Sequence, residues 1–149
     1  FLAILAADIR YQIIPDGAIL IGTFFAFFKM WVDYRYTGMV NFLVFPSSLG
    51  AALFFLSLVL LTRGKGMGMG DVKLSFLMGL ILGFPKIMVA VFLAFLTGAL
   101  LGITLVLAGK KKLKDKVAFG PFLITGLVVA LIWGQIIWEV YFYGNFIFR

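Results

Sequence analysis

Acidic side chains are the groups in this sequence that could perform catalysis, because the 149 residues contain six of them and neither cysteine nor histidine. A thiol nucleophile, an imidazole base and a cysteine-based zinc site are therefore excluded within these residues. Two carboxyl groups that face each other could still share one proton, so that one acts as a base and the other donates a hydrogen bond. Such a pair can hydrolyse a peptide bond, since one group activates water while the other polarises the scissile carbonyl. The composition therefore favours aspartyl proteolysis among the hydrolytic mechanisms.

Three of the six acids have a structural interpretation that needs no chemistry. Asp33 lies in the stretch WVDYRY close to Arg35, which indicates a solvated acid in a loop on the outer side. Asp115 lies inside the basic stretch KKKLKDKV, where it dilutes positive charge. Glu139 follows a tryptophan in the last apolar run, as an acid at the membrane interface would. We therefore look for catalytic groups among the other three.

Those three acids all border apolar runs: Asp8 ends FLAILAAD, Asp16 follows Pro15 ahead of the second run, and Asp71 opens the fourth. Aspartate often caps a helix N-terminus. For Asp16 and Asp71, two interpretations stay open: each could cap a helix, or each could contribute to a functional site. Asp8 is different, because it ends a helix, where the helix dipole disfavours an anion. Carboxylates at membrane level are costly and are usually functional.

Glycines precede Asp71 in the stretch GKGMGMGD, residues 64–71. A phosphate-binding loop is excluded, since no strand precedes it and no Lys-Ser or Lys-Thr pair opens the helix. Glycine alternates with other residues here in a pattern similar to that of a potassium-channel filter, in which backbone carbonyls replace the hydration of the ion. The flanking cations Arg63, Lys65 and Lys73 would repel such an ion. We favour a third interpretation, in which the glycines let an extended peptide backbone approach Asp71.

Long apolar runs must position these acids, because 64% of the residues are hydrophobic and only 13% are charged. Soluble domains are about half apolar and about a quarter charged. We predict an all-α fold, a single-domain membrane bundle of about six transmembrane helices over residues 1–149. The predicted stretches are Phe1–Ala7, interpreted as the remnant of a truncated first helix, then Gly17–Val32, Leu43–Thr62, Asp71–Phe84, Pro85–Ala108 and Phe119–Tyr141.

The basic residues predict which side of the membrane holds the three candidate acids. Nine of the thirteen Lys and Arg residues lie in the loops 8–16, 63–73 and 109–118, and four lie on the other side. The positive-inside rule makes the side with nine cytoplasmic, and all three acids lie on it. The net charge of +7 therefore indicates membrane orientation, and nucleic acid is not expected as a partner.

The fourth apolar run is too short to cross the hydrocarbon core. Val72 to Phe84 is 13 residues, or roughly 20 Å of helix, against a core of about 30 Å. Its cytoplasmic end should therefore start below the lipid surface, or the bilayer should thin there. Either arrangement predicts that Asp71 is semi-buried and accessible to water.

Three segments together resemble one family, the type IV prepilin peptidases. GMGDVKL resembles the family's GxGD motif, with Gly68, Gly70 and Asp71 in register. AADIRYQIIPD resembles the upstream aspartate segment, and FGPFLITG, residues 119–126, resembles the segment that opens the last helix. The three occur in the family's order across essentially the whole chain, which makes the combination more specific than GxGD alone.

The resemblance implies a membrane-embedded aspartyl endopeptidase of the inner membrane, with Asp8 and Asp71 as the catalytic pair. Its substrates would be prepilins or pilin-like pseudopilins, whose short basic leader the family removes at the cytoplasmic face. Substrate contacts would come from Gly68, Gly70, Lys73 and Asp16.

The chain also departs from many members of that family. They carry an N-terminal region, often with a four-cysteine zinc site, that is associated with methylation from S-adenosylmethionine. These residues contain no such region, so we expect no cofactor or metal here unless a missing N-terminal region supplies zinc and S-adenosylmethionine. Archaeal preflagellin peptidases, which share the two aspartates, are the alternative within the same chemistry. A cation channel that uses GMGMGD as its filter is the alternative from another class, and the oligomeric state is not predicted.

Overall fold

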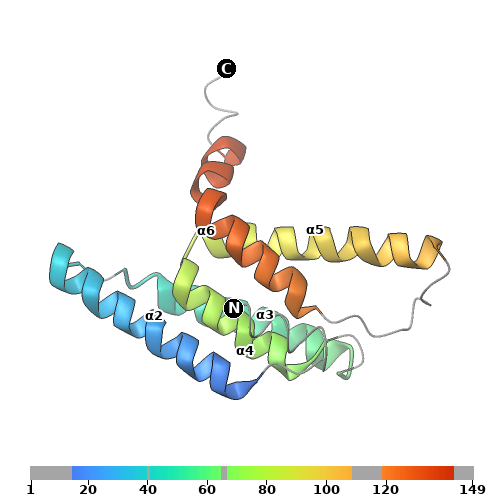
Figure 1. The fold of residues 1–149 in the computed structure, drawn as a ribbon, viewed down its shortest axis with the longest axis horizontal. Coiled ribbons are helices and arrows are strands. Elements are labelled where there is room, and N and C mark those ends of the chain that lie inside the picture. Colours follow the sequence, from blue (N-terminus) through green and yellow to red (C-terminus); the bar gives the residue numbers. More distant parts are fainter. Residues whose placement is uncertain (1–14, 40, 65–66, 109–118, 143–149) are drawn as a thin grey trace.

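The fold is an assembly of α-helices, seen in a computed structural model that describes residues 15–39, 41–64, 67–108 and 119–142 (Figure 1). Every regular element within these residues is a helix, which confirms the predicted all-α class. The predicted first run, Phe1–Ala7, lies outside the described residues, so a total of six spans stays a prediction. The helices are α2 (Asp16–Thr37), α3 (Val44–Leu61), α4 (Met69–Leu82), α5 (Lys86–Leu107) and α6 (Gly120–Phe142).

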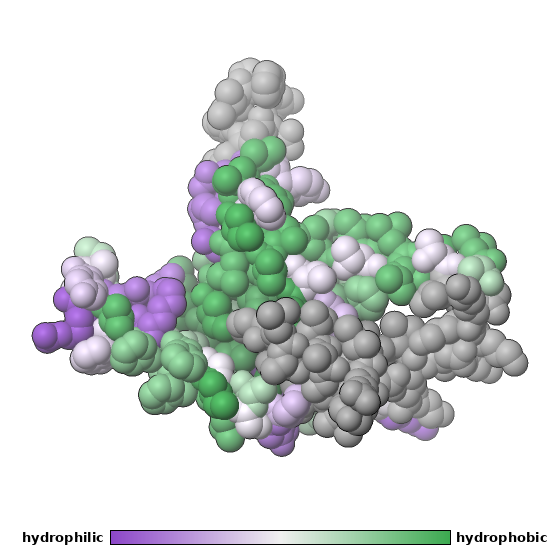
Figure 2. Space-filling model, in the orientation of Figure 1, coloured by the Kyte–Doolittle hydropathy of each residue, from purple (hydrophilic) through white to green (hydrophobic). Residues whose placement is uncertain are grey.

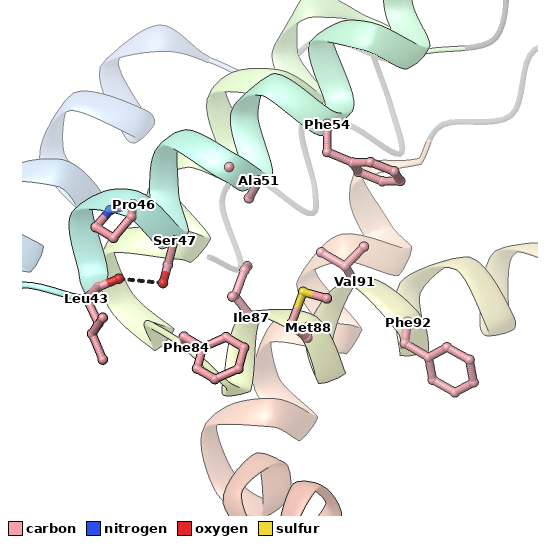
Figure 3. A pocket seen from close by; sticks show the side chains of 11 residues that line it. Leu43, Pro46, Ser47, Ala51, Phe54, Phe84, Ile87, Met88, Val91 and Phe92 are labelled. Atoms are coloured by element: carbon pink, nitrogen blue, oxygen red, sulfur yellow. Dashed lines mark hydrogen bonds between the residues drawn. The ribbon is translucent and has the colours of Figure 1, made fainter. Parts of the chain in front are cut away.

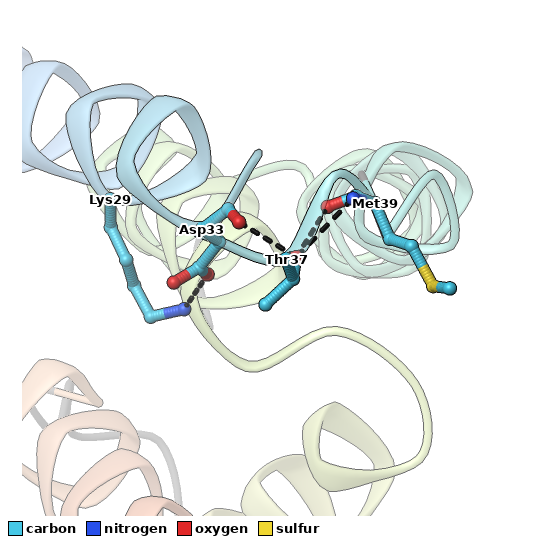
Figure 4. Close-up of polar contacts among 4 residues, drawn as sticks. All are labelled: Lys29, Asp33, Thr37 and Met39. Carbon is cyan, nitrogen blue, oxygen red and sulfur yellow. Dashed lines mark hydrogen bonds and ion pairs between the residues drawn. The ribbon is translucent and has the colours of Figure 1, made fainter. Parts of the chain in front are cut away.

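The end of α2 differs from the prediction, since the helix continues five residues past Val32. Figure 4 shows the contacts that extend it: the Lys29 ammonium pairs with the Asp33 carboxylate one turn on, and the Thr37 hydroxyl donates to the Asp33 carbonyl at 2.7 Å. Gly38 then ends the helix in the left-handed region, with φ at 68°. The placement of Asp33 in a loop was therefore wrong, because this acid belongs to the last turns of α2.

The helix at the centre of the fold is α4, in which eight of the fourteen residues are buried. It packs against α2, α3, α5 and α6. Towards its C-terminal end, Gly79 lies so close to α3 that a Cβ atom there would be 2.3 Å from the Cα of Ser48. Because Ser48 is near the start of α3, the two helices run antiparallel. The hydrophobic core gathers around α4 and includes Leu74, Leu77, Met78, Phe55, Leu123 and Leu127.

A second close pair is formed by α5 and α6. A Cβ atom at Gly126 of α6 would lie 2.3 Å from the carbonyl oxygen of Ala90 on α5. Gly98, further along α5, faces Phe119 just before α6 begins, so these helices also run antiparallel. In Figure 1 the C-terminal end of α5 extends beyond α6.

The outer surface of the described helices suits a lipid environment. Four of these helices, α2, α3, α5 and α6, are long and apolar enough to cross a membrane. Figure 2 shows hydrophobic residues over most of the visible helical surface, with hydrophilic ones at the C-terminal end of α2 on the left and in a smaller group on α6. In a bilayer such exposed apolar side chains face acyl chains rather than water. The chain is therefore a multi-pass membrane protein, and α4, with 14 residues, is short as predicted.

An apolar groove of about 740 Å³ lies between the N-terminal parts of α3 and α5 (Figure 3). The hydroxyl of Ser47 faces it but donates to the carbonyl of Leu43, so its polarity is satisfied within α3. Since α3 runs antiparallel to α4, the groove is nearer the C-terminal end of α4 than to Asp71. Its walls consist of Leu43, Pro46, Ser47, Gly50, Ala51, Phe54, Phe84, Ile87, Met88, Val91 and Phe92.

Candidate active site

The candidate site is built on the first turn of α4, which places Asp71 at the N-terminus of the central helix. Gly68 is the residue that precedes the helix, with extended backbone at φ −92° and ψ 160°. The Asp71 carboxylate accepts a hydrogen bond from the Gly68 backbone N–H at 3.2 Å, and the Asp71 N–H donates to the Gly68 carbonyl at 3.2 Å. The positive end of the helix dipole favours a carboxylate at this position. Asp71 therefore has the helix-start contact that its sequence position suggested.

Burial separates Asp71 from the other described acids. Its exposed fraction is 6%, whereas Asp16, Asp33 and Glu139 are exposed. Two of those exposed acids have partners within their own helices: Asp33 pairs with Lys29, and Glu139 accepts a hydrogen bond from Gln135 at 2.8 Å. A buried carboxylate costs free energy that a fold without functional need would avoid. Among the described acids, Asp71 is therefore the candidate for chemistry.

Asp16 and Lys73 are brought together by the fold, although 57 positions separate them in the sequence. The Lys73 ammonium contacts the Asp16 carboxylate at 2.5 Å, joining the start of α2 to the first turns of α4. Asp16 is the first residue of α2, and the residue before the helix is Pro15, with no capping side chain. The helix-cap interpretation of Asp16 was therefore wrong. The ends of α2 and α4 that carry these residues lie side by side.

Gly22 supports the same approach of α2 to α4, and the sequence analysis did not single it out. A Cβ atom at Gly22 would lie 2.7 Å from a methyl carbon of Leu77, one turn of α4 beyond Lys73. The two helices therefore run in the same direction from the candidate site. A glycine within an apolar span is the general signal for such close packing, but it does not name the partner helix.

Among the glycines before Asp71, Gly64 has φ at 69°, a conformation that favours glycine, whereas Gly68 is not required by the fold of the described residues. A Cβ atom at Gly68 would have only the Gly70 nitrogen within 4 Å, at 3.8 Å, and the φ of −92° is open to any residue. The helix already includes Met69 and Gly70, so their carbonyls are not arranged as an extended channel filter. Among the described residues, space is therefore left beside Gly68.

Asp8, the expected partner of Asp71, lies outside the described residues. The structure describes the chain from Pro15, whose carbonyl accepts the N–H groups of Ala18 and Ile19 at the start of α2. The segment that carries Asp8 therefore leads directly into the end of α2 that contacts α4.

Comparison with known proteins agrees with the motifs. Residues 1–103 match the type IV leader peptidase family. The chain is 30% identical over 137 residues to the prepilin leader peptidase/N-methyltransferase of Bacillus subtilis (strain 168), covering 90% of the chain and 52% of that protein. It is 29% identical over 147 residues to the protein of the same name from Pseudomonas aeruginosa, covering 94% of the chain and 49% of that protein.

A shorter match to the Aeromonas hydrophila prepilin leader peptidase/N-methyltransferase is 38% identical over 82 residues, covering 55% of the chain and 28% of that protein. The chain thus spans about half the length of the Bacillus and Pseudomonas relatives. No solved structure matches it significantly. Since the family match covers more than two thirds of the 149 residues, including Asp8 and the GxGD segment, the chain belongs to the type IV leader peptidase family.

Proposed function

We propose that this chain is a membrane-embedded aspartyl endopeptidase that removes the short basic leader of type IV prepilins or pseudopilins. The observation that carries this proposal is the burial of Asp71 at the start of α4, within the part of the chain that matches the family. The names of the relatives support a prepilin as the substrate. The absence of cysteine and histidine leaves a carboxylate pair as the chemistry that these residues can supply.

In the proposed mechanism, Asp8 and Asp71 share one proton and hold a water molecule between them. The ionised carboxylate removes a proton from the water, and the resulting hydroxyl adds to the carbonyl carbon of the scissile bond. The protonated carboxyl donates to the carbonyl oxygen as negative charge develops there. When the C–N bond breaks, the leaving nitrogen takes a proton from the pair, which returns to its starting protonation state. No metal ion or cofactor is needed for these steps.

The cytoplasmic face is the proposed location of this reaction. It is the side predicted to hold nine of the thirteen basic residues, and Asp71 begins α4 on that side. A pilin helix that enters from the lipid would carry its leader at this membrane surface. The short α4 would keep the catalytic level slightly below the surface, where both water and a membrane-bound substrate can reach it.

The direct test of this function is cleavage by the purified chain in liposomes. A model prepilin with a basic leader and an apolar helix should be cut once, at the end of its leader, as mass spectrometry of the two products would show. The same liposomes loaded with a potassium-sensitive dye should show no cation flux. Flux without cleavage would instead support the channel alternative. Cutting of preflagellins in preference to prepilins would favour the archaeal type of enzyme.

Changing Gly68 to Asn should slow cleavage without destabilising the fold. Asn is a preferred residue before a helix, so α4 should keep its start. Nothing in the described part of the protein blocks the added side chain, since a Cβ atom there has only the Gly70 nitrogen within 4 Å. We expect roughly a tenfold loss of kcat/KM, because the side chain would occupy the path of the substrate backbone. Unchanged cleavage would show that Gly68 does not provide clearance, and a lower Tm would assign it to the fold.

A further inference from the structure

We propose that Asp16 is a specificity-determining residue that binds a positively charged side chain in the leader of the substrate. In the same proposal Lys73, which holds Asp16 in an ion pair, is the cation that competes with the leader. This inference rests on the proposed function, because it assigns the surface beside Asp71 to the substrate that the site would cleave.

Asp16 is the exposed acid near the start of α4 within the described residues, since its carboxylate contacts Lys73 in the first turns of that helix. Asp33 is also exposed, but it lies near the other end of α2, which runs in the same direction as α4. Glu139 is in the last turn of α6, next to a tryptophan whose ring packs on Phe84, just past the end of α4. A substrate cation near Asp71 would therefore find its exposed carboxylate at Asp16.

The position of Asp16 does not depend on its ion pair, because apolar packing holds α2 in place. Ala18 and Ala26 pack against the hydrophobic core. The ring centroid of Phe27 lies 6.5 Å from that of Phe45 on α3. The ion pair itself is exposed, at 48% for the lysine and 70% for the aspartate, and exposed pairs contribute little to folding. Removing either charge should therefore leave the fold intact, and the pair is available for another task.

The Asp16 carboxylate can accept a second cation. The Lys73 ammonium contacts one oxygen, Oδ1, at 2.5 Å. A carboxylate has two oxygens with about four acceptor sites, and among the described residues the structure gives Oδ2 no partner. A leader cation can therefore bind beside Lys73 or replace it. Asp16 attracts that cation, and the charge of Lys73 opposes it.

The path from Asp71 to Asp16 crosses the start of α4. Asp71 and Lys73 are two residues apart, which places them about 200° apart around the helix. Asp16 pairs with Lys73 and is thus separated from Asp71 by the width of a helix, about 10 Å. The open space beside Gly68 leaves room for a peptide backbone to pass the helix end. Since an extended chain covers about 3.3 Å per residue, the side chain that meets Asp16 belongs to a residue roughly three positions from the cut.

The exposure of Asp16 assigns this contact to the leader side of the scissile bond. Its side chain is 70% exposed, whereas the other side of the bond begins an apolar helix that stays in the lipid. A charged side chain is costly inside the hydrocarbon. The leader is therefore the part of the substrate that can bring a cation to Asp16, in agreement with the basic leader of the proposed substrates.

The test is the leader preference of the chain in liposomes. It is kcat/KM for a model prepilin with lysine about three residues before the cut, divided by kcat/KM for the same prepilin with glutamine there. Asp16→Asn should lower this ratio about threefold to fivefold, as expected for loss of one exposed ion pair. Lys73→Gln should raise the ratio about twofold, because the competing cation is gone.

The matched control is Asp33→Asn, which breaks the exposed pair with Lys29 at the other end of α2 (Figure 4) and should leave the preference unchanged. The opposite signs for Asp16→Asn and Lys73→Gln are decisive. If the pair only aligned the helices, both variants would break the same contact and act alike. An unchanged ratio in Asp16→Asn, or an equal fall in both variants, would overturn the inference.

A binding measurement keeps this inference separate from the proposed function. In liposomes that hold the Asp71→Asn chain, fluorescently labelled lysine and glutamine prepilins should differ in affinity by about threefold to fivefold. Adding Asp16→Asn should remove that difference. If the unmodified chain cleaves nothing, the proposed function fails, and the difference in affinity still decides the role of Asp16. Equal affinities for the two prepilins would overturn the inference even when cleavage is confirmed.

Discussion

Asp71→Asn should reduce prepilin cleavage by at least about 10³-fold, because the amide can neither accept a proton from water nor supply one to the substrate carbonyl. The replacement has nearly the same shape, and its side-chain oxygen can still accept the Gly68 N–H that the carboxylate accepts at 3.2 Å. The helix start should therefore survive, which the Tm and the circular dichroism of the purified variant would check. Asp8→Asn should have an equally large effect if the two acids act as one unit.

The matched control for Asp71→Asn is Asp33→Asn, which removes an exposed acid at the far end of α2. It should leave cleavage within about twofold of the unmodified chain, since surface substitutions rarely disturb a fold. Full activity of a well-folded Asp71→Asn protein would remove Asp71 from the mechanism. Equal losses in Asp71→Asn and Asp33→Asn would point to a general effect of charge rather than to catalysis.

Gly79→Ala should destabilise the protein by about 3 kcal/mol, at the upper end of the usual cost of overpacking a core. The added Cβ atom would lie 2.3 Å from the Cα and 2.7 Å from the backbone nitrogen of Ser48. Backbone atoms cannot rotate away as the end of a side chain can, so α3 and α4 would have to separate. Because α4 carries Asp71, cleavage should fall together with stability. Thermal unfolding in detergent would measure the first effect and the liposome assay the second.

Gly102→Ala is the comparison for Gly79→Ala, since a Cβ atom at Gly102 of α5 would meet none of the described residues within 4 Å. Alanine has the higher helix propensity, so this variant should be as stable as the unmodified chain or slightly more so. A Gly79→Ala protein with an unchanged Tm would contradict the close approach of α3 and α4. If both variants lost stability equally, the cause would lie in helix glycines generally and not in the contact with Ser48.

The positions of the helices could be predicted from the sequence because apolar runs and their boundaries are local features. The observed limits of α3, α4, α5 and α6 agree with the predicted runs to within two residues at each end. The exception is the end of α2, where the polar stretch from Asp33 to Thr37 resembles a loop in composition. There the pairing of Lys29 with Asp33 and the cap at Gly38 extend the helix. Contacts between side chains one turn apart thus keep this stretch helical, although its polar composition is typical of a loop.

The candidate site was predicted only as far as local patterns allow. The motif and the position before a short apolar run identified Asp71, and its burial agrees with that choice. The partner of Asp16 could not be predicted, because the contact with Lys73 depends on how α2 packs against α4. The same is true of Gly126, whose neighbour Ala90 belongs to another helix. Contacts between distant segments are set by tertiary packing, which a single sequence does not display.

The most direct test of the central claim is whether Asp8 and Asp71 lie close enough to act on one water molecule. These 149 residues contain no cysteine, so any cross-link in a variant with two introduced cysteines must come from that introduced pair. Disulfide formation requires Cα atoms within about 7 Å, and short bifunctional reagents extend this range slightly. Asp16→Cys/Lys73→Cys, joined by a reducible bifunctional reagent about as long as a lysine side chain, is the positive control, since the Lys73 ammonium contacts the Asp16 carboxylate. Asp8→Cys/Asp33→Cys is the negative control, since Asp33 is about 25 Å along α2 from Asp16.

We predict that Asp8→Cys/Asp71→Cys cross-links in liposomes at a rate comparable to the positive control. The product should run as a compact species on a non-reducing gel and should disappear on reduction. The negative control should form no such product. Cross-linking of the positive control without any in the Asp8→Cys/Asp71→Cys chain would contradict the account, because the two acids would then be too far apart to share a substrate.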